Sequence, residues 1–188
     1  MVRAMKPLNF IKSPHQTLLE TERVVLRRYV RDDLDRLDRL NSNVDVMRYI
    51  GDGSLRTREQ TAAGIVRTLR IYENFPGLGF WAAEEKPKRN FIGVFALFYI
   101  PKTVEVEVGY RLVKSAWGRG LATEGASALV RYGIFELGLE RVVGLTHAEN
   151  EPSKRVLMKA GLEPRGTGNY YDKELCYFVA SASRFRQS

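Results

Sequence analysis

VKSAWGRGLATE, residues 113–124, is the stretch of sequence that decides the fold. A strand-like run leads into a Gly-x-Gly turn, and a helical pattern starts directly after the second glycine. Gly118 and Gly120 keep side chains away from the backbone, and the first turn of a helix has unpaired N–H groups and a partial positive charge. Arg119 adds a cation. The stretch predicts a phosphate-binding turn. It is neither a Walker loop nor a GxGxxG fingerprint, so a purely structural turn is the alternative.

A second helix start follows about 30 residues downstream, in NEPSKRVLMKAGLEP, residues 150–164. Asn150 suits the N-cap, Pro152 suits the first turn, and Ser153 lies three residues after the cap. A helix at 121–137 and a strand at 141–146 are expected in between. Two strands, each followed by a helix, would open side by side at their C-terminal ends, where open α/β sheets bind ligands.

The residues before this region predict an antiparallel meander. Runs 80–84, 91–100 and 104–112 are strand-like, and short turn-forming segments join them. The last run alternates, with Glu105, Glu107 and Arg111 opposite an apolar stripe that begins at Val104. The remaining expected elements are a strand at 23–30, a helix at 31–41, a helix from Thr57 with a capping-box pattern, a helix at 151–160, and strands near Leu162 and at 174–180.

These elements predict an α/β (mixed α+β) fold with a single central sheet. We expect residues 1–17 to form an N-terminal arm and residues 18–188 to form a single domain.

The net charge of +8 favours anionic partners, although basic and acidic residues are interleaved and a solvated surface is the alternative. No apolar run approaches the roughly 20 residues that span a bilayer. Cys176 is the only cysteine, and no secretory signal pattern is present, so we expect a cytoplasmic protein.

Residues 107–164 resemble the acyl-CoA-binding core of the GNAT superfamily of N-acyltransferases. The motifs GY, WGRGLATE and N-x-x-S-x-x-V-L-x-K-x-G are similar to those of the branch named for the ribosomal-protein acetyltransferases RimJ and RimL, and LETERVVLRRYVRDD at 19–33 resembles that branch's first strand. The resemblance implies a mostly antiparallel sheet that splays in its centre between flanking helices. It implies acetyl-CoA as the co-substrate and requires no metal.

The resemblance also implies where the cofactor lies. The pyrophosphate would contact the backbone amides of 118–123, and the pantetheine arm would follow the strand that ends at Val113. Trp117 is a departure, because the superfamily usually has Gln or Arg there. The implied cofactor-binding residues are Leu112, Val113, Trp117, Gly118, Arg119, Gly120, Leu121, Ala122, Thr123, Asn150 and Ser153.

Catalysis requires a base that removes a proton from the amine. Family spacing points to Glu107, with Glu105 as a second candidate and a solvated or paired carboxylate as the structural alternative. Leu157 stands where many members carry a tyrosine that protonates the leaving thiolate, so Ser153 is the nearest replacement unless it only caps the helix. A dedicated acid is not essential, because the thiol of CoA is itself acidic.

The acceptor site is expected between two walls. Tyr170 and Tyr171, on a loop between the last strands, would form one wall and contact substrate, unless they are only surface aromatics. The segment 31–74 would form the other. We expect acidic side chains at the mouth to attract a cationic amine: Asp32, Asp33, Asp45, Asp52, Glu59 and Asp172.

The predicted function is therefore transfer of an acetyl-type group from acyl-CoA to a primary amine by direct attack in a ternary complex. The favoured acceptor is a protein or peptide N-terminus, such as that of a ribosomal protein. A small amine (polyamine, amino acid or antibiotic) is the alternative, and so is a non-catalytic CoA- or RNA-binding module.

His147 is isolated, so a metal is not expected, and Cys176 is interpreted as core. Nucleic acid and membrane are not expected partners, and monomer and homodimer both stay open.

Overall fold

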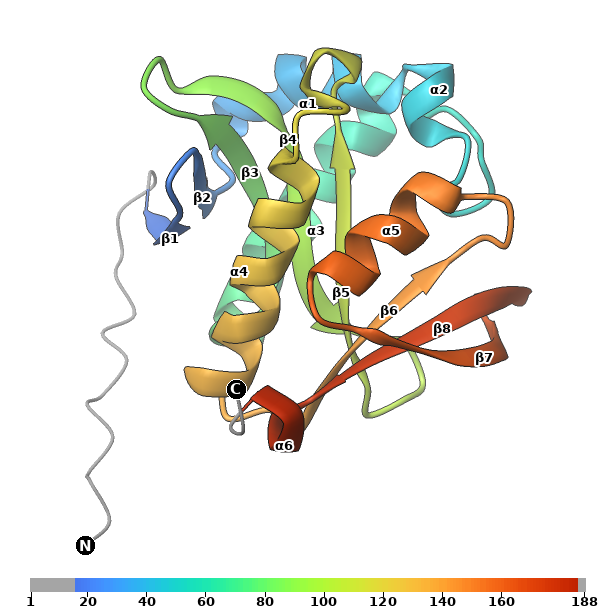
Figure 1. The fold of residues 1–188 in the computed structure, drawn as a ribbon. Coiled ribbons are helices and arrows are strands. Elements are labelled where there is room, and N and C mark those ends of the chain that lie inside the picture. Colours follow the sequence, from blue (N-terminus) through green and yellow to red (C-terminus); the bar gives the residue numbers. More distant parts are fainter. Residues whose placement is uncertain (1–15, 186–188) are drawn as a thin grey trace, which may run out of the picture.

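The computed structural model describes residues 16–185. They form an eight-stranded sheet in the order β1-β2-β3-β4-β5-β6-β8-β7, with α4 and α5 on one face and α3 on the other (Figure 1). The strands are β1 (Thr17–Glu20), β2 (Val24–Arg28), β3 (Gly79–Glu85), β4 (Asn90–Tyr99), β5 (Val106–Leu112), β6 (Arg141–Thr146), β7 (Glu163–Tyr170) and β8 (Lys173–Ser181). The helices are α1 (Leu34–Asn41), α2 (Val44–Met47), α3 (Arg58–Asn74), α4 (Leu121–Phe135), α5 (Glu151–Lys159) and α6 (Ala182–Phe185), with 3₁₀ turns η1 (Arg31–Asp33) and η2 (Lys114–Ala116).

The centre of the sheet is splayed, as predicted. Every pair of neighbouring strands is antiparallel except β5 and β6, which are parallel. These two strands share a single register pair, Glu107 with Val143, and then diverge toward their C-terminal ends (Figure 1). Each leads into a helix, β5 into α4 and β6 into α5. The two helix N-termini therefore meet beside the opening in the sheet.

Helix α4 lies close against the sheet because Gly125 has no side chain. A Cβ atom at this position would stand 2.4 Å from the Phe95 ring, a separation that real Cβ atoms do not adopt. Leu121, Leu129 and Val130 of the same helix are fully buried. This packing fixes the N-terminus of α4 at the end of β5.

The predicted helix caps are confirmed. Thr57 and Gln60 form a reciprocal capping box at the start of α3, with Gln60 N–H donating to Thr57 Oγ1 at 3.2 Å and Thr57 N–H donating to Gln60 Oε1 at 2.9 Å. Asn150 caps α5 by accepting from the N–H of Ser153 at 3.2 Å, and Pro152 lies in the first turn. Local side-chain chemistry thus sets both helix starts.

The structure corrects two expectations at element ends and adds one helix. Val104 lies outside β5 and is 85% exposed, because the turn after β4 extends to this residue and ends the alternation early. Thr17 begins β1, so the sheet starts inside the expected N-terminal arm, whose residues 1–15 lie outside the described part. The short helix α2 was not expected, and Asn43 caps it by accepting from the N–H groups of Asp45 and Val46.

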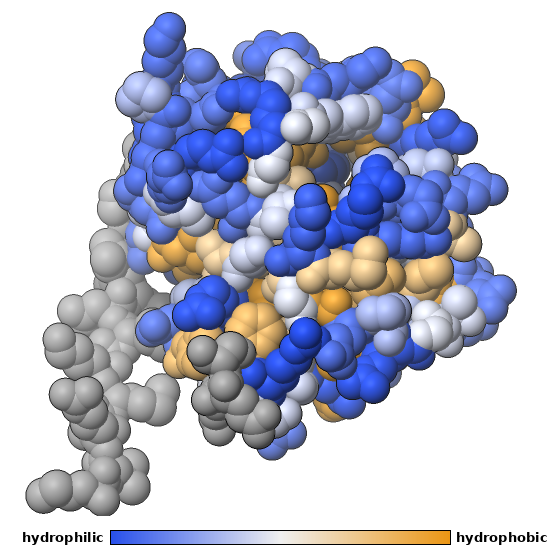
Figure 2. Space-filling view, viewed as in Figure 1, coloured by the Kyte–Doolittle hydropathy of each residue, from blue (hydrophilic) through white to orange (hydrophobic). Residues whose placement is uncertain are grey.

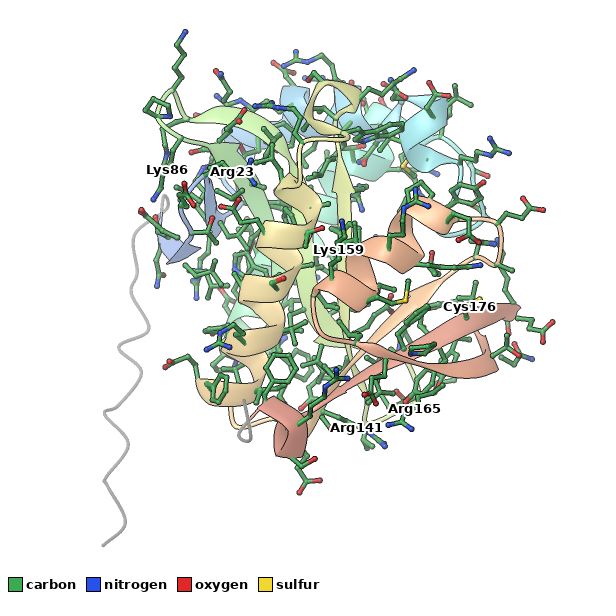
Figure 3. All side chains as sticks on the ribbon, in the orientation of Figure 1. Arg23, Lys86, Arg141, Lys159, Arg165 and Cys176 are labelled. Atoms are coloured by element: carbon green, nitrogen blue, oxygen red, sulfur yellow. The ribbon has the colours of Figure 1, made fainter. Side chains whose placement is uncertain are left out.

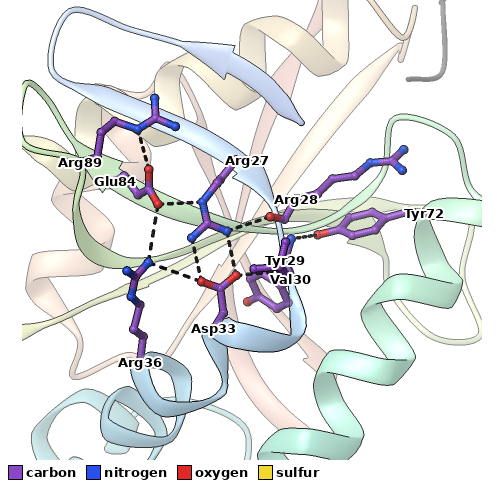
Figure 4. Close-up of polar contacts among 9 residues, drawn as sticks. All are labelled: Arg27, Arg28, Tyr29, Val30, Asp33, Arg36, Tyr72, Glu84 and Arg89. Atoms are coloured by element: carbon purple, nitrogen blue, oxygen red, sulfur yellow. Dashed lines mark hydrogen bonds and ion pairs between the residues drawn. The ribbon is translucent and has the colours of Figure 1, made fainter. Parts of the chain in front are cut away.

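A buried ion network ties β2 to β3 and to η1 (Figure 4). The Arg27 guanidinium is 3% exposed; it donates two hydrogen bonds of 2.7 Å to Asp33 and one of 2.7 Å to Glu84. Arg89 pairs with Glu84 from the other side, and Arg36 reaches both carboxylates at 3.7 and 3.8 Å. Burial alone would raise the pKa of Asp33, but the hydrogen bonds from Arg27 and from the Val30 N–H hold it below its ordinary value.

Hydrophilic residues cover most of the face that carries α4 and α5, and apolar residues show there as separate patches (Figure 2). Within residues 16–185, no helix has the length and hydropathy needed to cross a membrane.

Candidate functional site

A cavity of about 760 Å³ opens where β5 and β6 diverge. Its walls come from β4, β5, the end of β6, the first turn of α4, the length of α5, the segment 45–51 and the region of the β7–β8 turn. The predicted site residues in its lining are Glu107, Leu112, Trp117, Gly118, Gly120, Ala122, Thr123, Asn150, Ser153 and Tyr171. Val113, Arg119, Leu121 and Tyr170 lie outside the lining.

The N-terminus of α4 is the part of the cavity that fits a phosphate. No side chain of the described residues caps this helix, whereas side chains cap α2, α3 and α5. Gly118 and Gly120 have left-handed φ angles of 70° and 79°, and a Cβ atom at Gly118 would meet nothing within 4 Å. Free N–H groups, the helix dipole and an open approach make this turn suitable for a pyrophosphate.

Trp117 and Arg119 hold the turn in place. The Trp117 indole N–H donates to the carbonyl of Leu112 at 2.8 Å, which ties the turn to the end of β5. The Arg119 guanidinium is ion-paired with Glu85 of β3, and the Arg119 carbonyl accepts from Arg23 at 3.0 Å. The cation that we expected at the phosphate mouth is therefore engaged elsewhere, and the backbone amides remain as the anion-binding groups.

Glu107 is the buried acid of the cavity. It is 8% exposed, and its Oε2 accepts a hydrogen bond of 2.5 Å from the Tyr171 hydroxyl. Burial disfavours the charged form and raises the pKa of Glu107 to about 7, although the hydrogen bond from Tyr171 lowers it. A carboxyl group with this pKa can exchange a proton at neutral pH. Because Glu107 is buried, it is not a solvated surface carboxylate.

The backbone of the β7–β8 turn, which carries Tyr171, has a strained conformation. Tyr171 and Asp172 both have left-handed φ angles, 55° and 59°, in a two-residue turn where glycine and asparagine are the usual residues. Each such position costs on the order of 1 kcal/mol. Lys173, just after the turn, donates to the carbonyl of Gly51 at 2.8 Å. The turn is thereby fastened to the opposite wall of the cavity, with Tyr171 over Glu107.

Tyr110 is a site residue that the sequence analysis missed. Its hydroxyl lies 3.0 Å from Ser153 Oγ and 3.2 Å from the Ser153 carbonyl, and burial raises the pKa of Tyr110 to about 12. The alternation of β5 placed this tyrosine in the apolar stripe, and only the position of α5 shows that its hydroxyl meets Ser153. Since Asn150 caps α5, the Ser153 hydroxyl is not the cap.

Tyr170 has a different environment from Tyr171. Its hydroxyl donates to Glu105 at 2.8 Å, and its ring stacks on Tyr177, with 5.6 Å between centroids. Tyr177 donates to the other oxygen of Glu105 at 2.5 Å, and Arg141 lies 3.5 Å from the same oxygen. Glu105 is thus a structural carboxylate outside the cavity lining, and this leaves Glu107 as the acid at the opening.

The charges in the lining differ from the acidic mouth that we expected. Asp45 is the one member of the predicted acidic group in the lining, and it is paired with Lys114, while Asp33 is buried against Arg27. Asp45 and Glu107 face five basic side chains: Arg48, Arg111, Arg155, Lys159 and Lys173. Figure 3 shows Lys159 at the C-terminal end of α5. The cavity is therefore basic. Of the expected wall 31–74 only residues 45–51 line it, and of the expected loop wall Tyr171 lines it.

The described residues contain no group of three or more His, Cys, Asp or Glu side chains that could hold a metal. Cys176 lies on β8, half-buried, with a free thiol (Figure 3).

Comparison with known proteins identifies the family. The family model for the acetyltransferase (GNAT) domain matches residues 23–163, from β2 to the start of β7. This range includes all residues of the cavity lining except Tyr171, Lys173 and Leu175. The chain belongs to this family. It is an N-acetyltransferase that uses a coenzyme A-based acyl donor.

Individual relatives agree with the family. An uncharacterized N-acetyltransferase of Bacillus subtilis, YoaA, is 30% identical over 155 residues, 82% of this chain and 87% of the relative. Two solved structures in complex with coenzyme A share the fold. The ribosomal-protein α-N-acetyltransferase RimL has a TM-score of 0.74 at 15% identity, covering 88% of this chain and 98% of RimL. An aminoglycoside acetyltransferase has a TM-score of 0.74 at 18% identity with the same coverage, 88% and 98%.

Proposed function

We propose that this enzyme transfers an acetyl group from acetyl-CoA to the N-terminal amine of a peptide or protein. The observation that carries the proposal is Glu107, a buried carboxyl group with a pKa near 7 at the opening between β5 and β6. The uncapped turn at Gly118 and Gly120 lies in the same cavity and supports the binding of a pyrophosphate. The likeness of the sequence motifs to the RimJ and RimL branch favours a protein acceptor.

Proton transfer from the amine is the step assigned to Glu107. An N-terminal amine has a pKa of about 7.7–8.0, so at neutral pH it arrives mostly protonated. A carboxylate with a pKa near 7 can take that proton in a nearly balanced transfer. The freed amine then attacks the thioester carbonyl that acetyl-CoA supplies: the C–N bond forms, the nitrogen gives up its second proton to solvent, and the C–S bond breaks. The Tyr171 hydroxyl holds the carboxylate in position.

Protonation of the leaving thiolate is assigned to the Tyr110–Ser153 pair. Ser153 lines the cavity and shares a hydrogen bond of 3.0 Å with Tyr110, whose raised pKa keeps its hydroxyl protonated. This pair compensates for the leucine at position 157, which is fully buried in the core. The two protons lost by the ammonium ion thus go to Glu107 and to solvent, and the proton gained by the thiolate comes from the Tyr110–Ser153 pair, which regains it from solvent.

Acetyl-CoA is expected to raise the melting temperature of the protein, and Gly120→Val should abolish the shift. A ligand at 100 times its Kd stabilises the folded state by about 2.7 kcal/mol, which is several degrees for a protein of this size. Valine at Gly120 places a branched side chain at the first turn of α4 and strains a φ of 79°. Differential scanning fluorimetry with and without acetyl-CoA measures the shift.

Gly138→Val is the matched control for that experiment. Gly138 has a φ of 71° and an open environment, so valine strains its backbone similarly, but it lies outside the cavity lining. Both variants should lose stability, and only Gly120→Val should lose the response to acetyl-CoA. If Gly120→Val responds as the wild type does, the phosphate site lies elsewhere.

A peptide with a free N-terminus is expected to be acetylated in preference to spermidine at equal concentration. The basic lining of the cavity repels a polycation, whereas an uncharged peptide backbone meets no such barrier. Mass spectrometry of both acceptors in one reaction gives the ratio. Blocking the peptide N-terminus should end its modification. Exclusive acetylation of spermidine, or of a lysine in the blocked peptide, would contradict the N-terminal assignment.

A further inference from the structure

Arg111, on β5, has no partner for its charge among residues 16–185. Its Nε atom is shut off from solvent and makes no hydrogen bond, and the guanidinium forms no ion pair with a described residue. Buried arginines are normally paired, as Arg27 is with Asp33 and Glu84. Leaving a cation unpaired in this position is costly to the fold, so its retention needs an explanation outside the packing of the chain.

A second cavity, of about 480 Å³, surrounds Arg111 between the sheet and the helices α1 and α3. Arg56 and Arg67 also line it, and no aspartate or glutamate of the described residues does. Burial lowers the pKa of Arg111, and the nearby Arg56 lowers it further. The space is therefore a cationic one, in which an anion is the missing partner.

Asn41, which also lines this cavity, has a polar atom without a partner as well. Asn41 donates to the Thr61 hydroxyl at 3.1 Å, and its carbonyl oxygen is buried without a partner. Two buried polar groups of one cavity, a donor on Arg111 and an acceptor on Asn41, are thus left unsatisfied. Buried polar atoms without partners are rare in folded proteins, so Arg111 and Asn41 stand out among the residues that line this cavity.

The second cavity adjoins the first. Arg111, Ile50 and Phe80 line both, and Arg111 shares a face of β5 with Glu107, four residues earlier. Four residues of a strand span about 13 Å between Cα atoms. An extended peptide covers that distance in about four residues. A molecule with its amine at Glu107 can therefore reach Arg111 with a group three or four residues along.

We propose that Arg111, at the junction of the two cavities, binds a carboxylate group of the acceptor, with Arg56 as a second cation. This inference rests on the proposed function and adds a substrate class to it: peptides with an acidic side chain within the first few residues. The planar guanidinium suits a carboxylate, which it binds through two parallel hydrogen bonds. The same cations disfavour lysine-rich peptides and polyamines.

The test compares two pentapeptide amides, Ala-Glu-Glu-Glu-Phe and Ala-Gln-Gln-Gln-Phe, in which only side chains can supply carboxylates. The wild-type enzyme should prefer the glutamate peptide in kcat/KM by about 10- to 100-fold, the range that a charge-assisted hydrogen bond gives. Arg111→Gln should bring the ratio close to one, and Arg111→Lys should restore part of it. Arg165→Gln should keep the full ratio, because Arg165 on β7 lines neither cavity (Figure 3).

Thermal unfolding provides a second readout. Removing a partly buried cation that has no partner among residues 16–185 should leave the melting temperature of Arg111→Gln unchanged or raise it, whereas removing a structural arginine would lower it. A wild-type ratio near one, or a ratio that survives in Arg111→Gln, would overturn the inference while peptide acetylation itself stands. If neither peptide is acetylated, the peptide assignment is wrong, and 6-aminohexanoic acid against its amide decides the inference: no preference for the acid overturns it.

Discussion

Glu107→Gln is expected to lower kcat by roughly ten- to ten-thousand-fold, with little change in the affinity for acetyl-CoA. Glutamine keeps the size of the side chain and can still accept the hydrogen bond from Tyr171, but it cannot take a proton from the amine. The turn at Gly118 and Gly120, which we propose as the phosphate site, is left unchanged by this substitution. Thiol release at saturating acetyl-CoA measures kcat, and the thermal shift with CoA measures binding.

The pH dependence gives the same assignment a second test. Glu107 acts as a base only when it is ionised, so kcat should rise with pH through about 7. The Tyr171 hydrogen bond lowers the pKa of Glu107; Tyr171→Phe removes it, so the rise should move to higher pH. Tyr177→Phe is the matched control, because Tyr177 donates to Glu105 outside the cavity, and its profile should match the wild type.

Stability separates a chemical effect from unfolding in these variants. The pKa of Glu107 is raised on folding, so its contribution to stability is largest below its ordinary pKa of 4.5 and is lost as pH rises through about 7. Glu107→Gln removes the buried charge and should therefore be as stable as the wild type at pH 8, or more so. An active, stable Glu107→Gln with near-wild-type kcat from pH 6 to 9 would remove Glu107 from the mechanism.

Arg27→Met should cost about 3–5 kcal/mol of unfolding free energy, the largest stability effect expected in this protein. Methionine keeps the apolar stem but leaves the Asp33 and Glu84 carboxylates buried without the guanidinium that binds both (Figure 4). For a protein of this size the melting temperature should fall by roughly 6–20 °C. Urea unfolding followed by circular dichroism gives the free energy directly.

Arg58→Met is the matched control for this prediction. Arg58 also pairs with two carboxylates, Asp35 and Asp38, but its side chain is 51% exposed. Exposed pairs contribute about 0–1 kcal/mol, so the control should lose little. Equal losses in the two variants would show that burial is not what makes the Arg27 network important.

Local patterns predicted the elements that build the site. The meander of β3, β4 and β5, the caps at Thr57 and Asn150, and the parallel pair β5–β6 all follow from signals within short stretches of the chain. The sequence analysis did not predict β1 and α2, because each has only four residues, too few to show a hydrophobic periodicity.

Partners from distant parts of the chain could not be predicted. Nothing near Arg119 indicates that Glu85, 34 residues earlier, takes its guanidinium. Alternation correctly separated the two faces of β5 near Glu107, but it could not show that Tyr171 would cover this carboxyl group, nor that Tyr110 would meet Ser153. The sequence also could not show that Arg111 has no ion-pair partner among residues 16–185, because this is recognised only when its spatial neighbours are known.

The divergence of β5 and β6 has a consequence for how the molecule avoids aggregation. Unpaired strand edges usually lie at the outside of a sheet, where they can join the strand of another molecule. Here the backbone of β5 beyond Glu107 is freed of its neighbour in the middle of the sheet, with α4 and α5 beside it (Figure 1). This inner edge is flanked by helices, so the sheet edge of another folded protein reaches it less easily than an outer edge, whereas a narrow, flexible chain with amide groups of its own can enter and pair with it. The fold thus keeps unpaired backbone groups available to a narrow chain and away from the outer edges of the sheet.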